Sequence, residues 1–324
     1  MRIRAIVVSI LLAVMLVACV GSSSLQLATG GIGGTGIAAG PITGFGSIFV
    51  NGVEYDIDAA TLTRNGQPAT GQHEYRIGEY VVVKGTVNPD GLTGTATEVS
   101  FSNELEGTVT AETTDGVDIE IMGQVIRTNT LTVSHGFTQL AELGIGNVVE
   151  VSGVRDGQDV LQAASMTLKQ RSYVPGTETE LKGLVRQLDA LNKTFQIGNL
   201  TVDYTQAMLD GFGTTPLVNG QYVEAKTQQA LQGNRMQAYS IELENEYDHF
   251  DNGTQIELHG VVTRFVSIAD FSVNRQAVVT TATTDFEDGA ASALRLNALV
   301  EVDGQINAQG VLVADEVSVK DSGF

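Results

Sequence analysis

The densest group of side chains able to bind a metal lies in the last quarter of the chain. It comprises Asp248, His249, Asp251, Glu257 and His259. Carboxylate oxygens on a turn could hold Ca²⁺, and two histidines with an aspartate could hold a transition metal. The spacing matches no calcium-binding loop, however, and the group lies where two repeated units join. We therefore favour a solvated linker at this position and expect no cofactor.

Motifs for catalysis begin at several places but are incomplete. His73-Glu74 starts like a zinc-protease motif, but Ile77 stands where the second histidine is required. Ser134 and His135 are adjacent, which does not place a base against a nucleophile across a site. Residues 31–36 match Gly-x-Gly-x-x-Gly, but a dinucleotide loop needs a strand before it and a helix after it. The sequence therefore predicts that the protein is not an enzyme.

Two sets of side chains recur at equivalent positions along the chain. They are Glu150, Glu224 and Glu301, and Phe49, Phe195 and Phe271. The glutamates alternate with apolar residues, so we expect them on the outer surfaces of separate domains. The phenylalanines could form a stacking platform for sugars or bases, but their apolar neighbours favour core packing.

These side chains belong to a unit that occurs four times. Each copy opens with a glycine in a short strand, at Gly44, Gly107, Gly183 and Gly260. A hairpin follows, and it is clearest at Asn51-Gly52, because both residues of such a turn tolerate positive φ. A strand of alternating apolar and charged residues comes next, as in Val149-Glu150-Val151, and then a polar turn and a closing strand. The pattern predicts five strands in each copy.

The only helix-compatible stretch lies between the third and fourth strands and is clearest at residues 137–143. Five strands with a short helix at this place are typical of an OB-fold barrel. The expected fold is therefore all-β, a tandem row of small five-stranded antiparallel OB-like barrels. Their expected bounds are 41–103, 104–171, 178–245 and 255–322. Whether the barrels pack together or hang separately is left open.

The N-terminus carries the features of an export signal. Two arginines precede an apolar run at residues 5–18, which is too short to span a membrane comfortably and is typical of a signal peptide over residues 1–18. Leu16-Val17-Ala18-Cys19 resembles the bacterial lipobox, which implies a lipid on Cys19 and cleavage before it. Val20 follows in place of the aspartate associated with inner-membrane retention. We therefore expect an exported protein, lipid-anchored in the outer membrane of a Gram-negative bacterium.

Composition and charge indicate a solvated surface and argue against nucleic acid as a partner. Residues 19–40 are rich in Gly and Ser and predict a flexible tether between lipid and barrels. Cys19 is the only cysteine, so the cleaved chain would have no disulfide. The formal net charge is −20, whereas nucleic-acid binding depends mainly on lysine and arginine facing phosphates.

The repeat also resembles a known family. The tether glycines at 30–36, the phrase Gly-Phe-Gly-Ser-Ile-Phe-Val-Asn-Gly-Val at 44–53 and the later Val-Glu-Val-x-Gly strands are similar to bacterial lipoproteins with domain of unknown function 5666. The resemblance covers most of the cleaved chain. It implies export and small OB-like barrels, and it implies no activity. The third copy departs most, with Thr227 in place of the strand-ending glycine.

Three functions compete on this evidence. The first is a non-catalytic envelope lipoprotein that presents tandem OB-like domains as a binding or scaffolding surface. The alternative is a periplasmic ligand-binding protein for a cation, a glycan or another small molecule. A hydrolase comes third. The expected partners are the membrane, through the lipid anchor, and an envelope protein or glycan.

Overall fold

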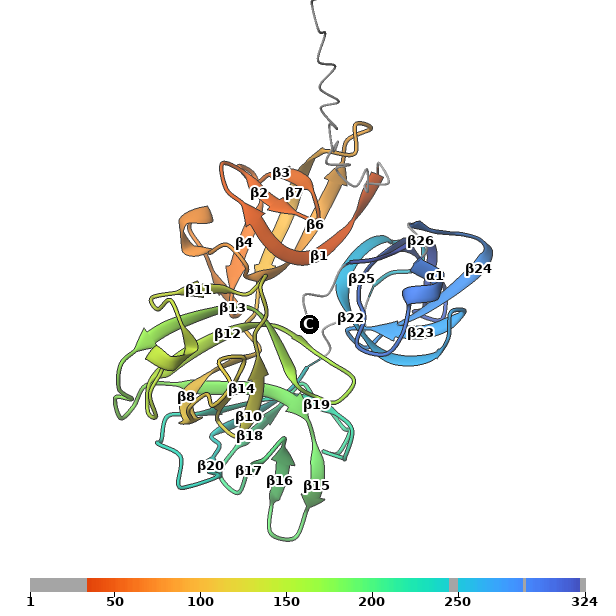
Figure 1. Cartoon of the computed structure of the whole chain (residues 1–324). Helices are drawn as coiled ribbons and strands as arrows, with labels where there is room; N and C mark the ends of the chain where they lie inside the picture. The colour runs from red at the N-terminus through yellow and green to blue at the C-terminus, as the bar shows by residue number, and fades with distance from the viewer. Residues whose placement is uncertain (1–33, 245–249, 288–289, 321–324) are drawn as a thin grey trace, which may run out of the picture.

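The computed structural model describes residues 34–244, 250–287 and 290–320. The expected signal peptide, Cys19, Asp248 and His249 therefore lie outside the described residues. Strands make up most of the described chain and form four barrel-like units in chain order, coloured from orange to blue in Figure 1. No helix of the described chain is long and apolar enough to cross a membrane.

The strands of each unit follow the order of the sequence repeat. The first unit holds β1 (Gly34–Gly44), β2 (Ile48–Val50), β3 (Val53–Asp56), β4 (Thr61–Arg64), β5 (Gln67–Pro68), β6 (Tyr80–Val87) and β7 (Thr93–Phe101). The second holds β8 (Leu105–Ala111), β9 (Asp118–Ile121), β10 (Gln124–Arg127), β11 (Val133–His135), β12 (Val148–Arg155) and β13 (Leu161–Gln170). The third holds β14 (Thr179–Leu184), β15 (Arg186–Asp189), β16 (Thr194–Ile197), β17 (Leu200–Asp203), β18 (Met208–Asp210), β19 (Tyr222–Thr227), β20 (Arg235–Gln237) and β21 (Ser240–Leu243). The fourth holds β22 (Gln255–Ser267), β23 (Asp270–Val273), β24 (Gln276–Phe286), β25 (Leu299–Ile306) and β26 (Leu312–Val319).

The first unit closes into a barrel through its hydrogen-bonded pairs. β1 pairs with β2, β2 with β3, β3 with β7, β7 with β6, and β6 with β1 again. The second and fourth units close in the same way, in the orders β8-β9-β10-β13-β12 and β22-β23-β24-β26-β25. The expected all-β row of OB-like barrels is confirmed. Each closed barrel contains parallel pairing, such as that of β3 with β7, where the sequence predicted antiparallel strands throughout.

A glycine permits the close approach of the fourth and fifth strands. Gly85, Gly153 and Gly304 each stand at a β-bulge, where a Cβ atom would lie only 2.1–2.3 Å from a carbonyl oxygen of the partner strand. The third unit has Thr227 here, and the Thr227 hydroxyl donates a hydrogen bond to the carbonyl oxygen of Gln237 (2.7 Å). The partner strand is interrupted at this point into β20 and β21. Where Thr227 replaces the glycine, the fifth strand of the third unit is therefore broken in two.

The expected helices are short. Of residues 137–143, only Leu140–Glu142 forms a turn of 3₁₀ helix, which the Gln139 and Glu142 side chains cap. Gln72–Glu74 forms a similar turn in the first unit, and α1 (Ala290–Ala293) occupies this place in the fourth. One or two turns suffice because the segment only has to cover the end of a barrel.

The four units pack together through shared sheets. β1 of the first unit lies parallel to β22 of the fourth, and β8 of the second pairs with β14 of the third (Figure 1). A Cβ atom on Gly36 would lie 2.8 Å from the carbonyl oxygen of Gln255, so this glycine permits the β1–β22 contact. The expectation that the tether extends to residue 40 is wrong, because residues 34–40 belong to β1 and pair with β6 and β22.

Buried ion pairs connect the first and second units. The Arg64 guanidinium lies 2.8 Å from Glu79 within its own unit and 2.8 Å from Glu150 in the second. Burial alone would lower the pKa of Arg64 and raise that of Glu150, but their pairing reverses both shifts. The expectation that Glu150 and Glu224 are surface charges is wrong, since both are buried. The alternation puts them outside their barrels as predicted, but neighbouring side chains and units cover that face.

Candidate functional site

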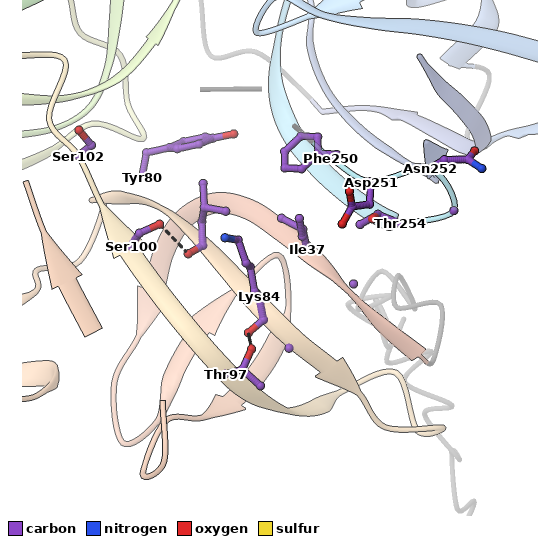
Figure 2. A pocket seen from close by; sticks show the side chains of 14 residues that line it. Ile37, Tyr80, Lys84, Thr97, Ser100, Ser102, Phe250, Asp251, Asn252 and Thr254 are labelled. Atoms are coloured by element: carbon purple, nitrogen blue, oxygen red, sulfur yellow. Dashed lines mark hydrogen bonds between the residues drawn. The ribbon is translucent and has the colours of Figure 1, made fainter. Parts of the chain in front are cut away.

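A cleft of about 830 Å³ lies between the first unit and the segment that leads into the fourth. One wall is the outer face of β6 and β7, and the other is formed by residues 250–254 (Figure 2). Alternation along β6 builds the first wall: Val81 and Val83 point into the barrel, so Tyr80, Val82 and Lys84 face outwards. A volume of this size is in the range of ligand-binding clefts.

The cleft lining mixes ring surfaces with hydroxyl, amide and charged groups. Figure 2 shows Tyr80 and Phe250 on opposite walls, with the Lys84 side chain pointing between them. Thr97 and Ser100 line the β7 side, and their hydroxyls donate to the carbonyl oxygens of Lys84 (3.1 Å) and Val82 (3.4 Å). Asp251 and Asn252 supply a carboxylate and an amide from the other wall. These groups can donate and accept hydrogen bonds around a polar ligand.

The charged side chains that line the cleft are Lys84 and Asp251, one positive and one negative. The Lys84 ammonium lies 3.1 Å from Glu98, and about half of the Lys84 side chain is exposed. An exposed pair of this kind contributes little stability and can exchange partners easily. The cleft therefore does not select strongly for an anion or a cation.

Tyr80 holds the first, second and fourth units together at the edge of this cleft. Its backbone N–H donates to the Ser152 hydroxyl (2.8 Å), and its own hydroxyl donates to the carbonyl oxygen of His259 (2.6 Å). The Asn274 amide in turn donates to the Tyr80 oxygen (3.0 Å). The Tyr80 ring packs into the hydrophobic core of the fourth unit.

A second cavity, of about 400 Å³, lies where the first, second and fourth units meet. Its lining is mostly aliphatic and includes Ile42, Ile77, Leu131, Val154 and Leu299. Tyr80 lines both this cavity and the polar cleft. The two spaces exist only because the units pack together.

The structure separates the residues that the sequence singled out as metal candidates. Asp251 lies in the wall of the cleft, whereas Glu257 lines a different, smaller cavity. Glu257 and His259 lie on β22, so the solvated-linker interpretation is wrong for these two residues. Burial, with a smaller effect of Lys320, lowers the pKa of His259 to about 4. Burial next to Asp303 raises the pKa of Glu257.

The incomplete catalytic motifs have other surroundings. Glu74 accepts hydrogen bonds from the backbone N–H and hydroxyl of Thr70, which lower its pKa. Nε2 of His135 lies 2.9 Å from the carbonyl oxygen of Ile77 in the first unit, a contact in which this nitrogen donates. Phe195 and Phe271 are buried in the cores, as predicted, and Phe49 is half-buried. The expectation of no enzymatic activity stays a prediction.

Sequence reasoning missed the basic residues that bind units to one another. Arg155 in the second unit is buried, donates to the carbonyl oxygen of Lys182 in the third (2.6 Å), and lies 3.5 Å from Glu104. In the sequence, Arg155-Asp156-Gly157 belongs to the polar turn that precedes the closing strand of the second copy. A buried arginine at a domain joint leaves no local signal, because its partners come from distant segments.

Three carboxylates converge in the third unit. Oxygens of Glu224, Glu242 and Glu244 lie within 4.8 Å of one another. Lys226 lies 2.8 Å from Glu224, and Lys182 lies 3.2 Å from Glu244. The two lysines thus already balance much of the negative charge of this group.

These features define the class of the protein: tandem OB-type barrels packed so that cavities form between them. The chain belongs to the family described as domain of unknown function (DUF5666), whose model matches residues 37–100, 106–167, 182–242 and 259–318. A solved structure titled "drosophila Unr CSD456" is similar at 15% identity, covering 68% of this chain and 97% of that one, with a TM-score of 0.17. No curated protein matches the chain.

Proposed function

We propose that this protein is a non-catalytic, lipid-anchored envelope protein whose four barrels form one binding body, and that the cleft between the first and fourth units holds a polar, uncharged ligand such as a glycan. The observation that carries the proposal is the cleft itself. It combines the half-buried ring of Phe250, two strand hydroxyls and an amide with one lysine and one aspartate. Sugars match such a lining, because their C–H faces pack on rings while their hydroxyls exchange hydrogen bonds with polar groups.

Lipidation at Cys19 and export to the outer membrane are part of this proposal. The Leu16-Val17-Ala18-Cys19 motif supports both. A lipid-anchored protein in that compartment would meet peptidoglycan strands and other envelope glycans. Nucleic acid is disfavoured by the net charge of −20.

The test is isothermal titration calorimetry of the full chain with uncharged glycan probes, the tetramer and hexamer of N-acetylglucosamine. Thr97→Trp fills the cleft from an exposed position of β7. Thr95→Trp is the matched control, because Thr95 is exposed on the same strand but does not line the cleft. We expect saturable binding to the wild type and to Thr95→Trp and at least a tenfold loss in Thr97→Trp. Equal binding by all three proteins would contradict the proposed site.

A further inference from the structure

Two acidic side chains face each other inside the joint between the first and fourth units. Glu257 on β22 and Asp303 on β25 are directly opposite one another in register. Opposite residues of antiparallel strands have Cβ atoms about 4.5–5.5 Å apart. Both side chains are buried, at 7% and 6% exposure, and β1 covers the other edge of β22. Two like charges are therefore held together away from water.

A small cavity of about 30 Å³ lies beside this pair. Glu257, Asp303 and Tyr55 of the first unit line it. A cavity needs roughly 10–15 Å³ to accept one water-sized particle, so there is room for a bare ion or a water molecule. The Oε1 atom of Glu257 is buried and, among the described residues, has no hydrogen-bond partner. An oxygen in this state costs stability unless something positive or protonated lies against it.

The repeats themselves supply a comparison. Glu104, Glu180 and Glu257 occupy one repeat position, three residues before Gly107, Gly183 and Gly260, and all three glutamates are buried. Arg155 lies 3.5 Å from Glu104, and Lys226 lies 3.5 Å from Glu180. Within the described parts of the chain, neither a lysine nor an arginine forms an ion pair with Glu257.

The residue on the opposite strand explains why Glu180 has a positive partner and Glu257 has none among the described residues. Lys226 faces Glu180 in the third unit, and Asp303 faces Glu257 at the equivalent place in the fourth. Lys320 acts electrostatically on Glu257, but its ammonium is paired with Glu301 at 3.1 Å. Glu301, Glu316 and Glu287 add further negative charge around Asp303. The fourth unit thus replaces a positive side chain by a second negative one.

We propose that Glu257 and Asp303 bind a hard divalent cation, with the Tyr55 hydroxyl oxygen beside them, and that this ion fastens the fourth unit to the first. Among the side chains that line the cavity, those of Glu257, Asp303 and Tyr55 offer oxygen atoms, which Ca²⁺ and Mg²⁺ prefer as ligands. A divalent ion neutralises both carboxylates and takes the place that the Lys226 ammonium occupies in the third unit. Burial and mutual repulsion raise the pKa of both groups, and a bound divalent ion would offset both effects.

The test uses the full chain, stripped with a chelator at pH 7.5 and titrated with CaCl₂ and, separately, MgCl₂. Binding is followed by calorimetry and by the unfolding temperature, since an ion specific for the native state raises it. Asp303→Lys reproduces the third unit and should abolish the response while leaving the ion-free protein at least as stable as the wild type. Asp303→Asn keeps the size of the side chain and should also lose the response, with a binding constant at least tenfold weaker.

Glu180→Gln is the matched control, because it alters the same repeat position in the third unit, where Lys226 is the partner. It should keep the wild-type response to the ion. A wild-type protein that ignores both ions at pH 7.5 would overturn the proposal and show that the pair holds a proton instead. An unchanged response in Asp303→Asn would also overturn it and would place the ion elsewhere. Neither outcome depends on whether the cleft binds a glycan.

Discussion

Replacing Tyr80 by phenylalanine tests how firmly the first and fourth units are joined. The hydroxyl bonds both the His259 carbonyl oxygen (2.6 Å) and the Asn274 amide (3.0 Å). Each neutral hydrogen bond contributes about 1 kcal/mol net. The His259 oxygen keeps a second donor, because the Asn274 amide also reaches it at 3.2 Å. The His259 acceptor therefore keeps a partner, whereas one N–H of the buried Asn274 amide loses its acceptor. We expect a loss of about 2–3 kcal/mol in the free energy of unfolding.

The assay combines thermal unfolding with hydrogen exchange along the β1–β22 joint. A loss of that size lowers Tm by roughly 2–6 °C in a protein of this length. Tyr75→Phe is the matched control, because the Tyr75 hydroxyl also bonds two backbone oxygens, those of Thr63 and Val99, but within the first barrel. Only Tyr80→Phe should speed exchange of the β22 amides. Equal exchange at that joint in both variants would refute the reasoning.

Three further predictions concern single joints and strands. Arg64→Met leaves Glu79 and Glu150 buried without their shared cation, so we expect the free energy of unfolding to fall by about 3 kcal/mol. Urea unfolding measures this loss, and a value below about 1 kcal/mol would contradict the prediction. Gly304→Ala places a Cβ atom 2.2 Å from the Val313 carbonyl oxygen and should lower the free energy of unfolding by roughly 1–3 kcal/mol. Gly310→Ala is the control for backbone strain alone, because φ is positive there but no atom lies near the added Cβ. The pKa values of Glu257 and Asp303 are raised in the folded state, so between about pH 4 and those raised values the folded state holds protons that the unfolded state releases. Without added cation, the contribution of this pair to stability therefore falls as the pH rises through that range. Asp303→Asn should flatten that fall in unfolding measured at pH 5 and pH 8, and an unchanged slope would disprove the assignment.

The barrels could be predicted from the sequence because their signals are local and occur in several copies. Period-two alternation on β6, β12 and β25, the turn at Asn51-Gly52 and the recurring glycines together specify strands, turns and close approaches. The departure at Thr227 was visible in the sequence, and the break between β20 and β21 lies opposite it. Each of these features depends on residues within one unit.

The joints between units could not be predicted in the same way. Alternation assigns Glu150 and Glu224 to the outer face of a barrel, but it does not say what covers that face. The glycine-rich composition of residues 34–40 is typical of a tether. These residues form a strand beside β22, which lies more than 200 residues later in the chain and gives no local signal. The cleft was missed for the same reason, since its walls come from β6, β7 and residues 250–254.

Disulfide trapping tests most directly whether the four barrels form one body. Gln158 in the second unit is exposed, Asn297 in the fourth is half-buried, and a side-chain hydrogen bond joins them. In a Cys19→Ser background, Gln158→Cys with Asn297→Cys should cross-link under mild oxidation as completely as Asp118→Cys with Arg127→Cys, a cross-strand pair within the second barrel. Cross-linking of the Asp118–Arg127 pair alone would show that the units hang separately and that no cleft persists between them.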